Sequence, residues 1–161
     1  ATSTVITAEN TGNSAVTLNL DADRSGADQG LGNINFKWNG TAVAQISGAS
    51  GADTTNKDDG QIQFSTMSGG SSSVNMTLDK DGKLGLGISP VFNSLHIHKP
   101  NSDYNYIHIT NTTTGTTHDD GLLFGFESDE HAYIVNRENT NLNQWKFIKY
   151  KEINAWIIKH I

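Results

Sequence analysis

The chain has 161 residues, of which only 35% are hydrophobic, and its mean hydropathy is −0.46. This is little apolar material for a self-sufficient core, and the abundance of Asn, Thr, Ser and Gly favours turns and hydroxyl-rich strands over helices. The absence of cysteine excludes disulfides and thiolate metal sites. A formal net charge of −6 disfavours nucleic acid as a partner, and no apolar run is long enough to predict membrane insertion.

Short β-branched and aromatic runs, bounded by Gly, Asn or Asp, predict strands throughout the chain. In chain order these runs cover residues 4–8, 15–20, 33–38, 42–47, 61–66, 74–78, 83–88, 94–98, 104–110, 122–127 and 132–136. The runs at 33–38 and 61–66 alternate polar and apolar residues, which is typical of a strand and fits no helix. We therefore expect an all-β protein.

Turn residues separate the predicted strands. Asn39-Gly40 and Asp81-Gly82 predict tight turns within hairpins, whereas Asp59-Gly60 and Asp120-Gly121 each open a strand. One two-stranded hairpin cannot bury its own apolar face, so we expect the hairpins to stack on one another or on partner chains.

Three segments differ in composition. Residues 1–90 are predicted to form an N-terminal β-rich repeat region, 91–142 a second β-rich lobe, and 143–161 an apolar and basic tail. Within the first segment, the Gly-, Ser- and Asp-rich stretches 47–59 and 67–73 predict exposed loops or a flexible break.

A longer motif, LDKDGKLGLGISP at 78–90 with SLHI at 94–97, joins an Asp-Gly turn to Leu-Gly-Leu-Gly, Ser-Pro and Leu-His-Ile. It resembles a signature common in bacteriophage tail-fibre and tail-spike proteins. The runs VAQISG at 43–48 and DGQIQFST at 59–66 are similar to strands that precede the signature in that family. The resemblance covers about residues 1–142 and implies a trimeric β-rich fibre, a structural role in the virion and, in many members, a host-attachment surface. The segment 143–161 matches neither the further repeats nor the autocleaving chaperone of that family.

The expected architecture is an elongated trimeric fibre segment of stacked short antiparallel hairpins, with intertwined lobes of the β-prism or β-sandwich kind. Three copies would pool the few apolar contacts that one copy offers. Gly85 and Gly87 would let backbones approach closely at a threefold seam, and the alternative for them is an ordinary bulge or bend in a sheet.

His96 and His98 form the sharpest candidate for a metal site. Alternation along a strand puts both imidazoles on one face, and in a trimer they could surround an axial transition-metal ion. The alternative is that Leu95 and Ile97 face the core while both histidines face water. No other cofactor is expected.

Aromatic rings beside amides are typical of sugar-binding surfaces. The candidates for contact with a host glycan or receptor are Tyr104, Tyr106, Tyr133, Asn101, Asn105 and Asn136. The alternative for the three tyrosines is core packing or a subunit interface.

No pattern of catalytic residues stands out, so we expect no enzyme. Asp119, Asp120, Glu127, Asp129 and Glu130 supply the carboxylates that a polysaccharide-degrading tail spike needs, but acidic residues beside turns more often form a solvated rim. The sequence Asp79-x-Asp81-Gly82 resembles the start of a calcium loop without its later ligands, which favours a hairpin turn. A secreted adhesin or lectin domain is a further alternative.

The residues 145–151 and 153–161 are the densest apolar stretch, with lysines between large side chains, and their pattern fits neither a strand nor a capped helix well. We interpret this tail as a plug that packs across chains; the alternative is a basic segment that touches a membrane or another virion protein. The resemblance to tail-fibre proteins thus implies a virion protein of the phage tail, extracellular when assembled. Its partners would be its own copies, other tail proteins and a host glycan.

Overall fold

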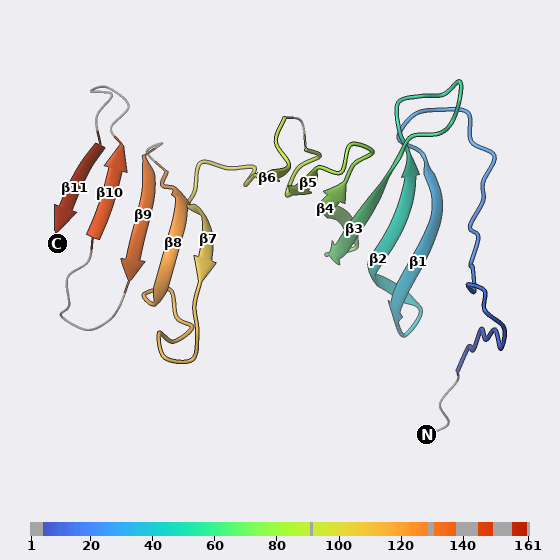
Figure 1. Ribbon diagram of the computed structural model, residues 1–161, viewed down its shortest axis with the longest axis horizontal. Coiled ribbons are helices and arrows are strands. Elements are labelled where there is room, and N and C mark those ends of the chain that lie inside the picture. The colour runs from blue at the N-terminus through green and yellow to red at the C-terminus, as the bar shows by residue number, and fades with distance from the viewer. Residues whose placement is uncertain (1–4, 91, 129–130, 138–144, 150–155, 161) are drawn as a thin grey trace. The chain divides into compact units, whose positions relative to one another are not determined.

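The structure, a computed structural model, describes residues 5–90, 92–128, 131–137, 145–149 and 156–160, the last two stretches by their backbone alone. Within these residues all regular structure is β-strand and no helix occurs, which confirms the all-β prediction (Figure 1). The strands are β1 (Gly30–Trp38), β2 (Thr41–Ser50), β3 (Gly60–Ser68), β4 (Ser71–Leu78), β5 (Leu84–Leu86), β6 (Leu95–Ile97), β7 (Asn105–Ile109), β8 (Gly121–Phe126), β9 (Ala132–Arg137), β10 (Trp145–Lys149) and β11 (Trp156–His160).

The chain divides into two compact units. The first unit comprises Ala1–Leu84 with Ser89–Ser94, and the second comprises Gly85–Ile88 with Leu95–Ile161. One sheet has the strand order β1-β2-β3-β4-β5-β6, and the other has the order β11-β10-β9-β8-β7.

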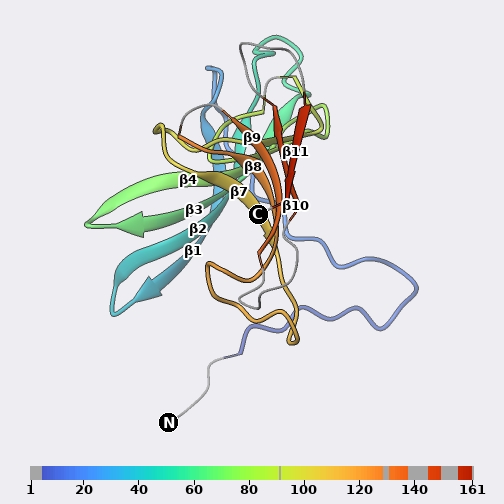
Figure 2. The same cartoon turned by 90° about the vertical axis from the view of Figure 1, so that its left-hand side faces the viewer.

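The strands β1 to β4 form an antiparallel meander, seen as one layer of strands in Figure 2. Tight turns join β1 to β2 and β3 to β4, and the loop 51–59 joins β2 to β3. Asn39 and Gly40 have φ angles of 47° and 86°, the left-handed pair that a two-residue hairpin turn requires. Gly69 and Gly70, at 56° and 82°, form an equivalent turn between β3 and β4. The expectation of a loop or flexible break over 67–73 is therefore wrong, because strands extend to both sides of this turn. Likewise β2 continues to Ser50, into the stretch expected to be a loop.

The register of this meander places a row of large apolar side chains on one face. Ile34, Ile46, Phe64 and Met76 lie opposite one another across β1 to β4, and we call them the first apolar row. Ile34 and Phe64 are 47% and 37% exposed, so no element that the structure describes covers this row fully.

The opposite face of the same meander is polar but better buried. Ser47, Ser65 and Thr77 are 7%, 4% and 1% exposed, and Ser47 and Thr77 both lie opposite Gln63 of β3. These short side chains lie in inner strands, where longer neighbours shield them from water. The burial is thus the reverse of the usual hydrophobic-in, polar-out pattern.

The second sheet has a conventional small core. Leu123, Tyr133 and Val135 are buried, and the partly buried ring of Tyr106 packs against Tyr133 and Val135. Gly125 lies in β8 directly between Tyr106 and Tyr133, and a Cβ there would meet the backbone of Asn105 and Tyr106. The glycine therefore allows β7 to approach β8 closely.

The other face of this sheet has its own apolar residues. Ile107, Phe124 and Ile134 lie opposite one another across β7, β8 and β9, and we call them the second apolar row. Ile107 and Ile134 are 44% and 37% exposed.

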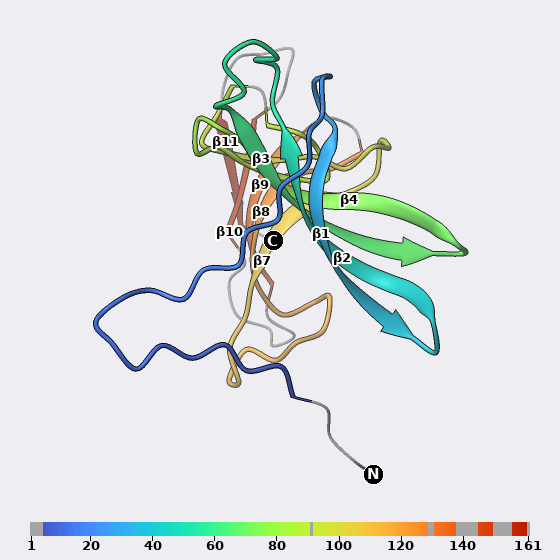
Figure 3. The same ribbon diagram turned by 90° about the vertical axis from the view of Figure 1, so that its right-hand side faces the viewer.

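The first two predicted strands are absent. Residues 5–8 and 15–20 form no strand, although Val16, Leu18 and Leu20 alternate as a strand would; residue 4 lies outside the described range. Figure 3 shows this segment as an irregular trace leading to β1. A strand needs hydrogen bonds from a neighbour, and within the described chain this run has none.

The tail forms strands where the structure describes it, although its pattern predicts a strand poorly, and its packing across chains stays a prediction. Residues 145–149 and 156–160 form β10 and β11, which pair antiparallel with each other, and β10 pairs with β9. The free edge of β9 supplies the hydrogen-bond partners that the weak alternation of the tail could not indicate. Residues 143, 144, 150–155 and 161 lie outside the described residues.

Gly87 explains part of the glycine pattern near the signature. Its φ is 75°, and a Cβ there would meet the carbonyl oxygen of His98 in the same chain. The backbone N–H of His98 donates to the Leu86 carbonyl at 2.9 Å, which holds the two segments together. A local bend within one chain therefore accounts for Gly87.

Candidate functional site

The connection from β6 to β7 is held by its own side chains. The Lys99 Nζ atom lies 2.7 Å from Asp103 Oδ2 and 3.3 Å from the carbonyl oxygen of Tyr104. The Tyr104 backbone N–H donates to Asp103 Oδ1 at 2.8 Å. The hydrogen bond from Lys99, followed by that from Tyr104, lowers the pKa of Asp103 below its ordinary value of 3.8. Asp103 is therefore ionised at neutral pH and fixes the shape of this connection.

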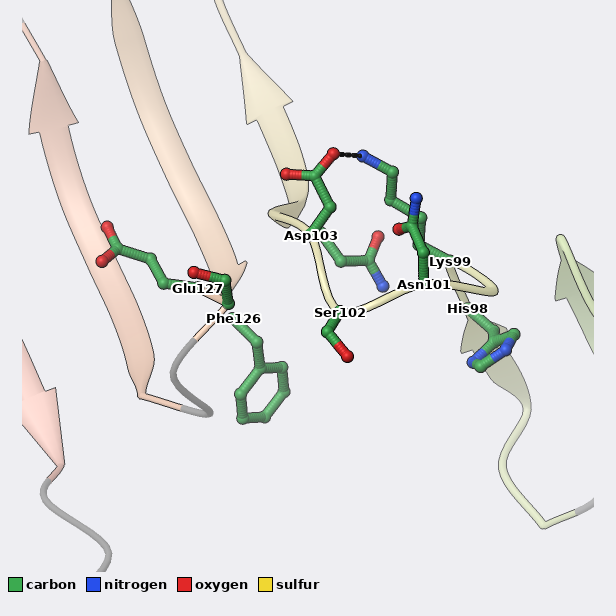
Figure 4. A pocket seen from close by; sticks show the side chains of 9 residues that line it. His98, Lys99, Asn101, Ser102, Asp103, Phe126 and Glu127 are labelled. Atoms are coloured by element: carbon green, nitrogen blue, oxygen red, sulfur yellow. Dashed lines mark hydrogen bonds and ion pairs between the residues drawn. The ribbon is translucent and has the colours of Figure 1, made fainter.

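A hollow of about 540 Å³ opens beside this connection, wholly within the second unit (Figure 4). We call it the polar hollow. It is lined by His98, Lys99, Asn101, Ser102, Asp103, Asn105, Phe126, Glu127 and Ser128. The Nδ2 group of Asn105 donates to the Ile97 carbonyl at 3.3 Å, which holds the start of β7 beside the end of β6. Two of the residues predicted to contact a glycan, Asn101 and Asn105, thus lie in one concave surface.

Two of the predicted tyrosines form a stacked pair near the polar hollow. The rings of Tyr104 and Tyr106 have centroids 5.9 Å apart and planes inclined by 15°. Tyr104 is 50% exposed, whereas the Tyr106 hydroxyl donates to Glu127 Oε1 at 3.1 Å. Burial, and next the hydrogen bond to Glu127, raise the pKa of Tyr106 far above its ordinary value. Tyr106 is therefore a neutral hydrogen-bond donor that links β7 to the end of β8.

Tyr133 does not join these rings at the surface. Its side chain is 7% exposed and belongs to the core of the second sheet. The core-packing alternative therefore describes Tyr133, and Tyr104 alone of the three offers a half-exposed ring.

His96 and His98 lie on the same side of their segment, as the alternation predicts. Their ring centroids are 6.4 Å apart with planes at 70°, and the buried Nδ1 atom of His96 has no hydrogen-bond partner in the described part of the chain. Leu95 is 48% exposed, so this segment does not follow the alternative in which Leu95 faces a core. No group of three or more metal-binding side chains gathers among the described residues. One chain thus offers two imidazoles, and the axial metal ion stays a prediction.

The acidic side chains after β7 are occupied by local partners. Asp120 Oδ2 accepts from the backbone N–H and the hydroxyl of Thr117 at 2.7 and 2.8 Å, and the backbone bond is the larger cause of its lowered pKa. Asp119 lies 3.7 Å from the guanidinium of Arg137. Asp129 and Glu130 lie outside the described residues. These contacts are those of turn-forming and surface carboxylates.

The Asp79-x-Asp81-Gly82 sequence forms a hairpin turn. Asp79 Oδ1 accepts from the backbone N–H groups of Asp81 and Lys83 at 3.0 and 2.8 Å, and Gly82 has a φ of 75°. The side chain that a calcium loop would aim at a metal is here used to close the turn.

Three lining features of the polar hollow were not predicted from sequence: Phe126, the Lys99–Asp103 ion pair and Ser102. The spacing of Lys99 and Asp103 would suggest pairing in a helix, but Pro100 between them argues against one. Phe126 ends a β-strand whose pairing with Asn105 brings it to the hollow, and that register could not be read from local sequence.

Comparison of the chain with protein-family models and with curated proteins finds no match. The described residues also contain no helix that could span a lipid bilayer. The sequence signature and the geometry of the two sheets therefore remain the basis for assigning a function.

Proposed function

We propose that the chain is a structural segment of a bacteriophage tail fibre or a related virion appendage. It acts as a homotrimer of elongated, intertwined β-lobes of the prism or sandwich kind, and it contributes to attachment at the host surface. Its role is non-catalytic, and its place is the tail of the virion, outside the cell once assembled. Its partners are its own copies, neighbouring tail proteins and a host glycan, and it neither binds nucleic acid nor inserts into a membrane.

The uncovered apolar rows of the two sheets carry this proposal. Each row runs across at least three strands, and each has side chains that stay 37–47% exposed in the single chain, as Ile34, Phe64 and Ile107 show. Soluble monomers seldom leave a continuous apolar face of this kind open to water. A second layer supplied by other copies is the ordinary way for a β-sheet to cover such a face.

The small buried core supports the same conclusion. The buried hydrophobic residues of the described chain are Ala49, Leu123, Tyr133 and Val135 alone. Burial of so few side chains in one copy offsets little of the conformational entropy that the chain loses on folding.

The residues of the tail-fibre signature adopt a defined local structure. Asp81-Gly82 turns the chain between β4 and β5, and the Leu-Gly-Leu run supplies β5 and its link to β6. The formal net charge of −6 agrees with a protein that does not bind nucleic acid.

The mass of the purified chain in dilute buffer tests the proposal. Sedimentation velocity and native mass measurement should find three times the 17.4 kDa of one chain. The variant Phe64→Asp places a carboxylate in the first apolar row, where an assembled trimer would bury it at a cost of several kcal/mol, so the trimer should dissociate.

A matched control lies on the opposite face of the same meander. Asn35→Asp adds the same charge at an exposed position, where the side-chain oxygen can still accept the 2.7 Å hydrogen bond from Gln45 Nε2. This variant should remain trimeric. A wild-type chain that stays a compact, durable monomer at micromolar concentration would overturn the proposal.

A further inference from the structure

The polar hollow contains hydrogen-bonding groups that the protein itself does not use. The side chains of Asn101 and Ser102 form hydrogen bonds to no residue that the structure describes. The Asn105 Nδ2 group donates to the Ile97 carbonyl, and the Asn105 Oδ1 atom is left as an acceptor for a ligand. Amide and hydroxyl groups of this kind match the paired donors and acceptors of sugar hydroxyls. Such groups at an open, exposed surface can bind a hydroxylated ligand without prior loss of an internal bond.

Phe126 supplies an apolar surface beside these groups. Its ring is 55% exposed at the end of β8, and Figure 4 shows it projecting into open space next to the Ser102 hydroxyl. A flat ring beside amides is the arrangement that can stack on the C–H face of a pyranose while its hydroxyls are bonded at the rim.

The charges around the polar hollow indicate which sugars would fit. Lys99 is held by Asp103, and Glu127 is engaged by the Tyr106 hydroxyl and points away from the hollow in Figure 4. The lysine therefore has little attraction left for a carboxylate or a phosphate, and the charges of Lys99, Asp103 and Glu127 together are negative, which repels anions. An acidic sugar is disfavoured on both counts.

We propose that the polar hollow is a binding site for an uncharged saccharide, with Phe126 as the stacking platform and Asn101, Ser102 and Asn105 as the hydrogen-bonding groups. This inference rests on the proposed function, because it names the ligand class through which the appendage would contact its host. A volume of about 540 Å³ lies within the range of about 300–1,000 Å³ usual for small-ligand sites. Binding at one such open site is expected to be weak, and repetition in an oligomer would strengthen it.

Titration of the intact chain with short oligosaccharides tests this site. The probes are neutral oligomers of glucose, galactose, mannose and N-acetylglucosamine, with uronate-containing and sialylated oligomers of similar length for comparison. Calorimetry or saturation-transfer NMR should detect binding of at least one neutral oligomer, and Phe126→Ala should weaken it about tenfold. Asn101→Ala should weaken it severalfold.

Two matched variants serve as controls. Phe92→Ala removes a ring that is 85% exposed in the first unit, and Asn93→Ala removes an exposed amide beside it, so neither should change binding. The inference fails if no neutral oligomer binds, if only acidic oligomers bind, or if Phe126→Ala and Asn101→Ala bind as tightly as the wild type.

The mass of each preparation separates this result from the proposed function. A trimer that binds no neutral sugar would overturn the saccharide site and leave the structural role standing. A monomer that binds a neutral sugar through Phe126 would support the site and overturn the trimer.

Discussion

The two sheets differ in the kind of side chain that they bury best. In the second sheet the best-buried side chains are Leu123, Tyr133 and Val135, as expected for a hydrophobic core. In the first sheet they include Ser65 and Thr77, while Ile34 and Phe64 of the first apolar row are 47% and 37% exposed.

The contrast follows from register. Both sheets are built from alternating sequences, but in β1 to β4 the first apolar row falls on a face that stays partly exposed, whereas Ser47, Ser65 and Thr77 are buried on the other face. The second sheet has enough close contact around Gly125 to pack a small core on one of its faces. If the copies associate as proposed, the first sheet would depend on them more strongly, and the second would hold more of its stability within one chain.

Truncation of one large ring in each sheet should give the largest difference between stability held within one chain and stability gained on association. Tyr133→Ala removes a ring that is 7% exposed, and it should cost about 3–5 kcal/mol in unfolding free energy at any protein concentration. Phe64→Ala removes a ring that is 37% exposed, so at high dilution it should cost under about 2 kcal/mol.

Urea unfolding followed by circular dichroism at several chain concentrations measures both values. The cost of Phe64→Ala should grow with concentration, because association buries the first apolar row. Equal costs for the two variants in dilute solution would show that the first sheet is covered within one chain.

A methyl group added at a glycine of each sheet gives a smaller but cleaner comparison. In Gly125→Ala the new Cβ meets the backbone of Asn105 and Tyr106, so β7 must move away from β8 at a cost of about 2–3 kcal/mol. In Gly48→Ala, within β2, the Cβ has no atom within 4 Å and should be neutral or slightly stabilising. Thermal unfolding monitored by circular dichroism compares them, and a destabilised Gly48→Ala would contradict the open packing of the first sheet.

Much of the fold could be predicted because its signals are local. Asn39-Gly40 and Asp81-Gly82 fix their turns by backbone conformation, and the alternation around Phe36 and Phe64 fixes the strand type. The absent strand at 15–20 shows the limit, because Val16 and Leu18 have the right pattern but the described chain gives them no partner strand. The tail shows the opposite case. Its alternation is weak, yet residues 145–149 form a strand because β9 offers them an edge to pair with.

The candidate site was predictable only in part for the same reason. Asn101 and Asn105 could be proposed from their residue type beside tyrosines, and both line the polar hollow. The burial of Tyr133 depends on its position opposite Gly125, and the approach of Phe126 depends on its position opposite Asn105. Cross-strand register sets both, and no single-strand pattern contains it.

The buried hydroxyl of Thr77, on the polar face of the first sheet, should slightly lower the unfolding free energy. Thr77 is 1% exposed, and its Oγ1 atom has no hydrogen-bond partner among the described residues. Thr77→Val keeps the shape and removes the unsatisfied group, so it should raise the unfolding free energy by about 1 kcal/mol. The control is Thr66→Val, which loses the 2.6 Å bond from Asn75 Nδ2 and should gain nothing. Destabilisation by Thr77→Val would mean that another chain or a water molecule satisfies this hydroxyl.

Acid should weaken both units by a small amount. Asp81 in the first unit and Asp103 in the second have lowered pKa values, caused first by hydrogen bonds from Lys80 and Lys99 respectively. A carboxylate with a lowered folded pKa adds stability above its unfolded pKa and loses it as the pH falls. Unfolding measured by residue-resolved NMR should therefore move in both units below about pH 4, and Asp81→Asn or Asp103→Asn should reduce the change in its own unit alone.

High pH, by contrast, should lower the unfolding free energy of the second unit alone. This is the smallest of the effects that we expect. Burial and the bond to Glu127 raise the pKa of Tyr106, and the first unit contains no tyrosine. Because the folded state retains the proton that the unfolded state releases, stability is complete below the unfolded pKa of 10.0 and falls as the pH rises above it. Tyr106→Phe should abolish this alkaline loss while it removes the bond to Glu127 at every pH. An equal alkaline loss in Tyr106→Phe would show that another group in the second unit titrates with folding.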